Sequence, residues 1–151
     1  GLCARVCTAG AIDYTQKDEY ISEKYGAIAT DLGTVTKHIF DLLLKCSIIM
    51  IEANHDEAML LSGPYPRHLK ERILSDCGHL SNKLCGALCA KLVREGALRK
   101  IILGHLSSDN NTPHLAYETV KNSIDNALCC NAGDITLFVA DRYSMKEEIG
   151  D

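Results

Sequence analysis

The chain has 151 residues, 46% of them apolar, which is enough for about one domain with a sizeable buried core. Its 16 basic and 20 acidic residues give a net charge of −4. This balance excludes a protein that coats nucleic acid through bulk positive charge, but it does not exclude a local basic groove. No run of residues approaches the roughly 18 apolar positions that a membrane helix needs, so we expect no membrane span and no membrane partner.

Hydrophobic periodicity predicts the secondary structure from Tyr25 onward, whereas residues 1–24 show little periodicity. In chain order we expect a strand at 26–30, a helix at 34–45, a strand at 47–51, short helices at 56–62 and 67–74, a helix from Ser81 to Gly96, a strand at 100–103, a helix at 113–128 and a strand at 134–140. Ser81 and Thr112-Pro113 are typical helix starts, and Gly96 is a typical helix end. The apolar face of the helix between Ser81 and Gly96 is expected to consist of Leu84, Cys85, Leu88, Cys89 and Leu92. The alternation of strands and helices indicates a layered α/β domain.

The eight cysteines include no C-x-x-C pair. We interpret them as reduced, buried, small hydrophobic residues of a cytoplasmic protein. Cys3 with Cys7 and Cys85 with Cys89 share i,i+4 spacing, so a metal or redox pair remains an alternative.

Polar residues with metal-binding chemistry follow three of the predicted strands. Asp31 follows the first strand, Glu52 to Asp56 the second and His105 the third. Carboxylates and imidazoles are suitable ligands for zinc or manganese. Each residue also has a simpler interpretation, because an Asp before Leu-Gly often forms a turn and a His after a strand is often a hydrogen-bonded loop residue.

Four segments together carry a resemblance to a known family. They are 29–33 (Ala-Thr-Asp-Leu-Gly), 52–56 (Glu-Ala-Asn-His-Asp), 74–82 around His79, and 102–111 around His105. Their order and spacing resemble the second half of metallo-β-lactamase-fold hydrolases, specifically the small bacterial branch that is similar to 5′-to-3′ DNA exonucleases. The resemblance covers about 25–143. It implies that 25–151 is the C-terminal half of an αββα sandwich, preceded by an unassigned segment at 1–24.

The resemblance also implies a site with two divalent metal ions, Zn²⁺ or Mn²⁺. Asp31 would be the carboxylate that bridges the ions, and His105 would be the last histidine ligand. His79 would face the leaving group, with Glu52 as the carboxylate that orients it for general acid catalysis. Three further residues are candidates for substrate contact or for support of the ligands: Asn54, His55 and Ser107.

Several of these assignments keep alternatives. His55 either positions substrate or caps the helix that starts near Asp56. The segment 107–111 is expected to shape the loop behind His105 rather than to contact metal. The basic stretch 67–72 could face phosphates, although a solvated helix face is the favoured interpretation.

The sequence departs from the family because it has no H-x-H-x-D-H segment, which supplies most of the metal ligands there. The chain also begins without Met, so we expect a truncated or processed chain that completes its site only in a full-length parent. A missing half would leave one apolar sheet face uncovered, which favours homo-oligomer formation or pairing with that half.

The resemblance leaves three functions open. The first is a metal-dependent phosphodiesterase that cleaves DNA as an exonuclease, of which this chain is one half, and the four segments together favour it. The second is a hydrolase of the same fold that acts on a small thioester or lactam. The pair of Glu52 and His79 weighs against the second function, because protonation of a leaving group in this way resembles the nuclease branch. The third is an inactive fragment that only binds a partner.

Overall fold

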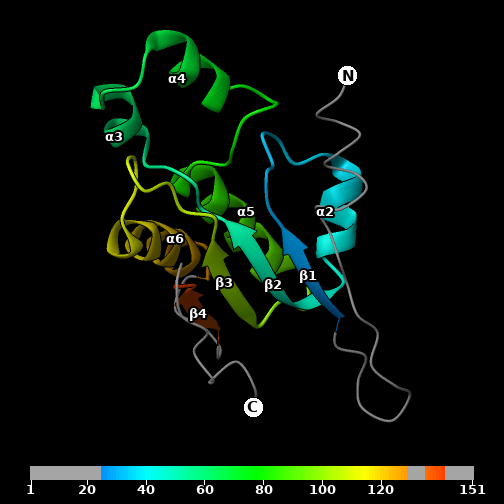
Figure 1. Ribbon diagram of the computed structural model, residues 1–151. Helices are drawn as coiled ribbons and strands as arrows, with labels where there is room; N and C mark the ends of the chain where they lie inside the picture. The colour runs from blue at the N-terminus through cyan, green and yellow to red at the C-terminus, as the bar shows by residue number, and fades with distance from the viewer. Residues whose placement is uncertain (1–24, 129–134, 142–151) are drawn as a thin grey trace.

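The computed structural model describes residues 25–128 and 135–141 (Figure 1). The strands are β1 (Tyr25–Ala29), β2 (Cys46–Glu52), β3 (Lys100–Gly104) and β4 (Thr136–Val139). The helices are α2 (Lys37–Leu43), α3 (Glu57–Ser62), α4 (Arg67–Ile73), α5 (Asn82–Glu95) and α6 (Pro113–Leu128). Every strand and helix predicted from residue 25 onward is confirmed, with ends that differ by a few residues.

Capping side chains fix where the helices begin. Ser81 accepts a hydrogen bond from the Leu84 N–H at 3.2 Å and is the N-cap of α5, as predicted. Thr36 accepts one from the Ile39 N–H at 3.3 Å, so α2 begins at Lys37 and not at residue 34. A capped start of this kind satisfies an N–H that has no partner within the helix.

The strands form one parallel sheet in the order β1-β2-β3-β4. Because all strands run the same way, their carboxyl ends meet at one edge of the sheet. Figure 1 shows α3 and α4 beyond this edge. The residues that follow β1, β2 and β3 are therefore neighbours in space although they are far apart in sequence.

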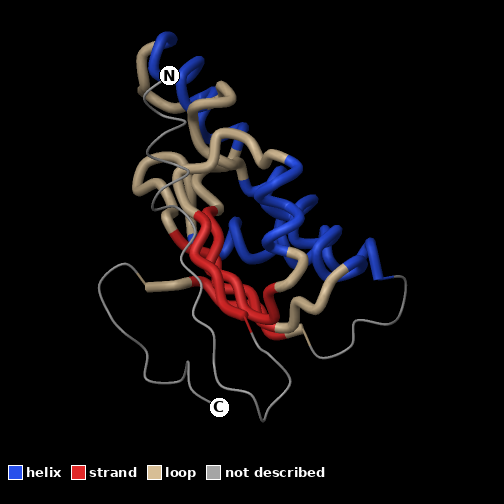
Figure 2. The backbone as a smooth tube through the Cα atoms, turned by 90° about the vertical axis from the view of Figure 1, so that its right-hand side faces the viewer, coloured by secondary structure: helices blue, strands red, loops and turns tan. Residues whose placement is uncertain are grey.

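The core lies between one face of the sheet and the helices α2, α5 and α6 (Figure 2). Gly86 brings α5 close to α6, because a Cβ at this position would lie 2.5 Å from the Ser123 hydroxyl oxygen. Leu84, on the same helix, is 53% exposed. The prediction that Leu84 belongs to the buried face of α5 is therefore wrong.

The other face of the sheet carries a row of apolar side chains, which we call the apolar row: Ile28, Met50, Ile102 and Phe138. These four residues are aligned across neighbouring strands by the sheet register. Ile28 is 48% and Phe138 38% exposed, although both lie in strands. An apolar sheet face with this exposure agrees with the expectation of a face left uncovered.

The described cysteines largely follow the prediction. Cys46, Cys85 and Cys89 are buried and reduced, and a hydrogen bond with Cys89 together with burial raises the pKa of Cys85. Cys77 is exposed, which corrects the prediction for that residue. The remaining cysteines lie outside the described residues.

Among the helices of the described residues, none is both long enough and apolar enough to cross a membrane.

We expect the apolar row to drive self-association of the chain. Phe138→Glu should lower the association of the chain at micromolar concentration, because a charge on this face would have to be desolvated in any contact. Light scattering over a concentration series measures the effect. Asn122→Glu, which adds the same charge on the exposed side of α6, is the matched control. Equal association of both variants would show that the row is not the contact surface.

Candidate metal centre

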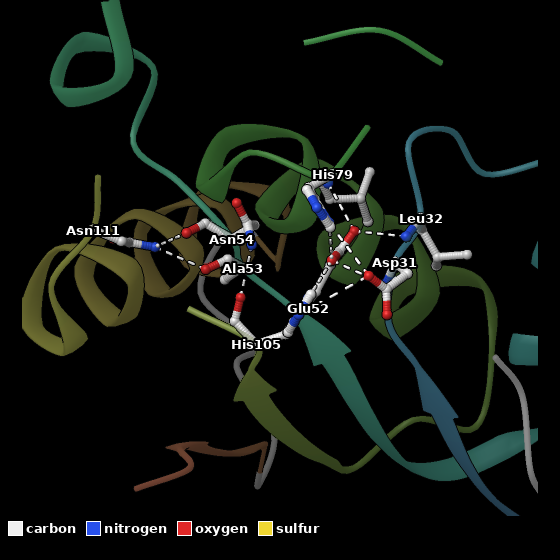
Figure 3. A network of polar contacts seen from close by, with 9 residues as sticks. Asp31, Leu32, Glu52, Ala53, Asn54, His79, His105 and Asn111 are labelled. Carbon is white, nitrogen blue, oxygen red and sulfur yellow. Dashed lines mark hydrogen bonds and ion pairs between the residues drawn. The ribbon is translucent and has the colours of Figure 1, made fainter. Parts of the chain in front are cut away.

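Four side chains with metal-binding groups meet at the carboxyl edge of the sheet (Figure 3). Asp31 follows β1, Glu52 ends β2, His105 follows β3, and His79 comes from the loop between α4 and α5. Their potential ligand atoms all lie within 4.8 Å of one another. We call these four residues the metal cluster. The structure thus brings together both predicted ligands and both predicted catalytic residues.

Asp31 and His105 both have left-handed backbone conformations, with φ values of 58° and 55°. In the described part of the chain, they are the two non-glycine residues with positive φ. Such conformations cost free energy and persist only where the surroundings enforce them, which happens most often at functional sites. The two predicted metal ligands are thus the two positions where the backbone is strained.

The carboxylate of Glu52 lies at the centre of the cluster and is completely buried. Its Oε1 accepts the backbone N–H groups of Leu32 at 2.7 Å and Leu80 at 2.9 Å. Its Oε2 accepts the N–H of Asp31 at 3.0 Å and faces Nδ1 of His105 at 3.0 Å and of His79 at 3.2 Å. One side chain therefore connects the loops after β1 and β3 with the loop before α5.

The surroundings of Glu52 keep it ionised. Burial by itself raises the pKa of this carboxyl, but the hydrogen bonds from His105, His79 and Leu80 outweigh it and lower the pKa from 4.5 to about 2. An ionised carboxylate only accepts hydrogen bonds, so each facing Nδ1 must carry the proton. In the neutral form of either ring the lone pair is then on Nε2.

This arrangement fits a divalent metal ion held by Asp31 and His105. His105 Nε2 lies 4.0 Å from Asp31 Oδ1. Two ligand atoms that each lie about 2.0 to 2.2 Å from one ion can be at most about 4.4 Å apart. A carboxylate behind an imidazole ligand is the usual way in which proteins fix the tautomer of a ligating histidine. Glu52 itself is a poor ligand, because five N–H groups already occupy its two oxygens.

The position of His79 differs from that of His105. Its Nδ1 lies 3.7 Å from Asp31 Oδ1 and 3.2 Å from Glu52 Oε2, and the rings of His79 and His105 meet edge to face. The same nitrogen thus lies near both carboxylates and is held by the buried one. His79 is therefore held by Glu52 at the side of Asp31, in an orientation suited to proton transfer.

A close backbone contact holds the Asp31 and His79 loops together. A Cβ at Gly33 would lie 2.2 Å from the Asp76 carbonyl oxygen, so only glycine allows the two loops to approach this closely. Gly78 in turn lets the His79 loop fold back on the end of α4, because a Cβ there would lie 2.0 Å from the Ile73 carbonyl oxygen.

A buried amide network supports the loop that carries His105. The Asn54 side chain donates to the His105 carbonyl oxygen at 2.9 Å. Asn111 donates to the carbonyl oxygens of Ala53 and Asn54, and its side chain exchanges hydrogen bonds with that of Asn82. Asn82 and Asn111 were not predicted as site residues, although both are terminal residues of the resembling segments. Their position in those segments is the signal that could have found them.

Ser107 lies where the loop prediction placed it. Its hydroxyl accepts the N–H groups of Asp109 at 3.3 Å and Asn110 at 3.2 Å, so it shapes the loop behind His105. It also lines the cleft beside the cluster, together with Asn54.

His55 is buried among the loops and has no hydrogen-bond partner on either ring nitrogen among the described residues. Burial lowers its pKa, which favours the neutral ring. The cap of α3 is Asp56, whose carboxylate accepts the Met59 N–H at 2.9 Å, so the alternative of His55 as the helix cap is wrong.

A cluster of carboxylates and imidazoles at the carboxyl edge of a parallel sheet offers the ligand types of a zinc or manganese site. No family model matches the chain. The exodeoxyribonuclease WalJ, from two strains of Streptococcus pneumoniae, is 41% identical over 105 residues, which are 70% of this chain and 39% of WalJ. The exodeoxyribonuclease YycJ of Bacillus anthracis is 35% identical over 99 residues, which are 66% of this chain and 37% of YycJ.

These similarities show that the chain is homologous to metallo-β-lactamase-fold DNA exonucleases, as the resembling segments predicted. The matched segment spans about two fifths of the length of these relatives. The single sheet with helices on one face agrees with a partial fold of this kind.

Glu52→Gln should destabilise the fold by about 3 kcal/mol at pH 7, because an amide cannot accept from five N–H groups in a buried site. The sign of the pH dependence follows from the lowered pKa. The ionised carboxylate stabilises the fold above pH 4.5, and this contribution is lost as the pH falls toward about 2. Urea denaturation between pH 2 and 7 measures both effects.

Glu71→Gln is the control, because it affects only the exposed pair with Arg67, and it should change stability by less than about 1 kcal/mol. A similar loss in both variants would contradict the central role of Glu52.

Proposed function

We propose that the full-length protein is a metal-dependent DNA exonuclease in which Asp31 and His105 bind divalent ions and His79 acts on the leaving group. The observation that carries the proposal is the metal cluster itself. Its two strained residues, Asp31 and His105, lie within binding distance of one ion and are both hydrogen-bonded to one buried carboxylate. The names of the relatives support DNA as the substrate class.

Two ions, Zn²⁺ or Mn²⁺, are proposed for the complete site, with Asp31 between them. Divalent ions in such a site act as Lewis acids on a phosphodiester and make water a better nucleophile. The other ligands would come from residues beyond the described ones, because the described part of the chain offers this one group of potential ligands.

The residues of this chain have separable roles. Glu52 holds the protons of both imidazoles on Nδ1, so His105 presents the Nε2 lone pair to a metal ion. The same carboxylate orients the His79 ring, which would donate a proton to the departing oxygen of the DNA strand. Asn54 holds the His105 peptide, and Ser107 keeps the following loop in shape.

Asp31→Ala should abolish both metal binding and DNA cleavage in the full-length protein, since one carboxylate would contact both ions. Elemental analysis after dialysis measures the metal, and release of nucleotides from a labelled strand with Mn²⁺ or Zn²⁺ measures the activity. Asp41→Ala, which removes an exposed carboxylate that pairs with Lys37, is the matched control and should keep both. Full metal content in Asp31→Ala would contradict the ligand assignment.

His79→Ala should keep the metal content and lower the rate of the chemical step by about 10² to 10⁴, the usual contribution of a general acid. Single-turnover kinetics separate this step from binding and release. If His79→Ala lost metal instead, His79 would be a ligand and the assigned roles would be wrong.

Assays with a lactam and with a thioester distinguish the proposal from the alternative of a small-molecule hydrolase of the same fold. Turnover of either compound without DNA cleavage would favour that alternative. A full-length protein that binds no metal would favour the third possibility, a fragment that only binds a partner. A cytoplasmic location remains a prediction.

A further inference from the structure

A cleft of about 430 Å³ adjoins the metal cluster. His79 and His105 line this cleft, and so does the loop at 106–108. The helix α4 also lines the cleft, through Leu69, Arg72 and Ile73. This volume is within the range of about 300 to 1,000 Å³ that is usual for ligand sites. A ligand that fills the cleft would therefore contact both the metal cluster and α4.

Other contacts hold α4 in place as a wall of the cleft. The ammonium group of Lys70 donates to the carbonyl oxygens of Leu61 at 2.6 Å and Gly63 at 2.8 Å, which joins α4 to α3. The Tyr65 hydroxyl donates to Asp109 at 2.6 Å, which joins the α3–α4 connection to the loop that follows His105. Tyr65, which also lines the cleft, thus connects the segment before α4 with the loop that follows His105.

Arg72 differs from the other arginine of α4. Arg67 forms an i,i+4 ion pair with Glu71 at 2.7 Å and does not line the cleft. Arg72 lines the cleft, and its guanidinium makes no ion pair with any residue that the structure describes. A guanidinium is well suited to bind phosphate oxygens through two parallel hydrogen bonds.

The neighbours of Arg72 on the same wall are apolar. Leu69 and Ile73 line the cleft one turn apart from each other, and both are only partly buried. Apolar side chains next to a cation provide a surface for the flat face of a base while the cation binds the backbone phosphate. Such a surface does not select among the bases.

We infer that this cleft binds one unpaired nucleotide of the DNA strand next to the bond that is cut, with Arg72 on a phosphate and Leu69 and Ile73 against the base. The inference rests on the proposed function and goes beyond it by assigning a subsite and a single-stranded substrate end. The chain has a net charge of −4, so its overall charge does not attract a polyanion such as DNA. Binding of a phosphate therefore depends on a local cation such as Arg72.

Binding of a fluorescent single-stranded oligonucleotide to the full-length protein tests the inference by anisotropy, with EDTA present so that no strand is cut. Arg72→Ala should weaken binding roughly tenfold and reduce the slope of log K against log salt by about 0.7, the value for one phosphate contact on a single strand. Arg67→Ala is the matched control and should change the affinity less than about twofold. Thermal melting of both variants checks that they fold.

A second arm tests the apolar wall. Leu69→Ala should weaken binding of an intact strand about threefold, yet should not affect a strand whose end nucleotides are abasic. Equal losses for both strands would overturn the base contact.

The outcomes separate the inference from the proposed function. If Asp31→Ala abolishes cleavage but Arg72→Ala binds DNA as Arg67→Ala does, the cleft assignment is wrong and the exonuclease stands. If the protein cuts no DNA but binds the strand through Arg72, the proposed function fails and the nucleotide subsite is supported. Tighter binding of the matching RNA strand would overturn DNA as the occupant.

Discussion

The buried carboxylate of Glu52 is the interaction on which the site depends. A completely buried charge is costly unless hydrogen bonds replace the lost water, and here three backbone N–H groups and two imidazoles do so. The hydrogen bonds outweigh the burial and lower the pKa to about 2. Because the donors come from the loops after β1 and β3 and the loop before α5, satisfying one carboxylate also sets the positions of Asp31, His79 and His105.

The parallel sheet makes this arrangement possible. Parallel strands end at a common edge, so a short loop after each strand delivers its first residue to the same place. At this edge the backbone adopts strained left-handed conformations at Asp31 and His105, which a network of hydrogen bonds maintains. Strained backbone and a buried charge each reduce the stability of the folded state. Their coincidence at one edge is therefore the physical reason to regard the cluster as a functional site.

The two faces of the sheet differ in what covers them. One face is packed under α2, α5 and α6, whereas the other carries the apolar row with Ile28 and Phe138 exposed. The exposed apolar face agrees with a matched segment that spans about two fifths of the length of the relatives. The cleft between α4 and the loop at 106–108 lies wholly within the described residues and is already formed.

The sequence by itself determined the order and type of the elements, because periodicity and caps such as Ser81 and Gly96 are local properties. The resembling segments also led to Asp31, Glu52, His79 and His105 before any coordinates, since these residues follow strands or lie in recognisable motifs. Only the tertiary structure decided what joins them. The five hydrogen bonds of Glu52, the pairing of Asn82 with Asn111 and the close approach of Gly86 to Ser123 all depend on contacts between distant segments. The position of Arg72 in the cleft was likewise decided by the tertiary structure, because a run of charged residues along a helix does not reveal which of them lines a cleft.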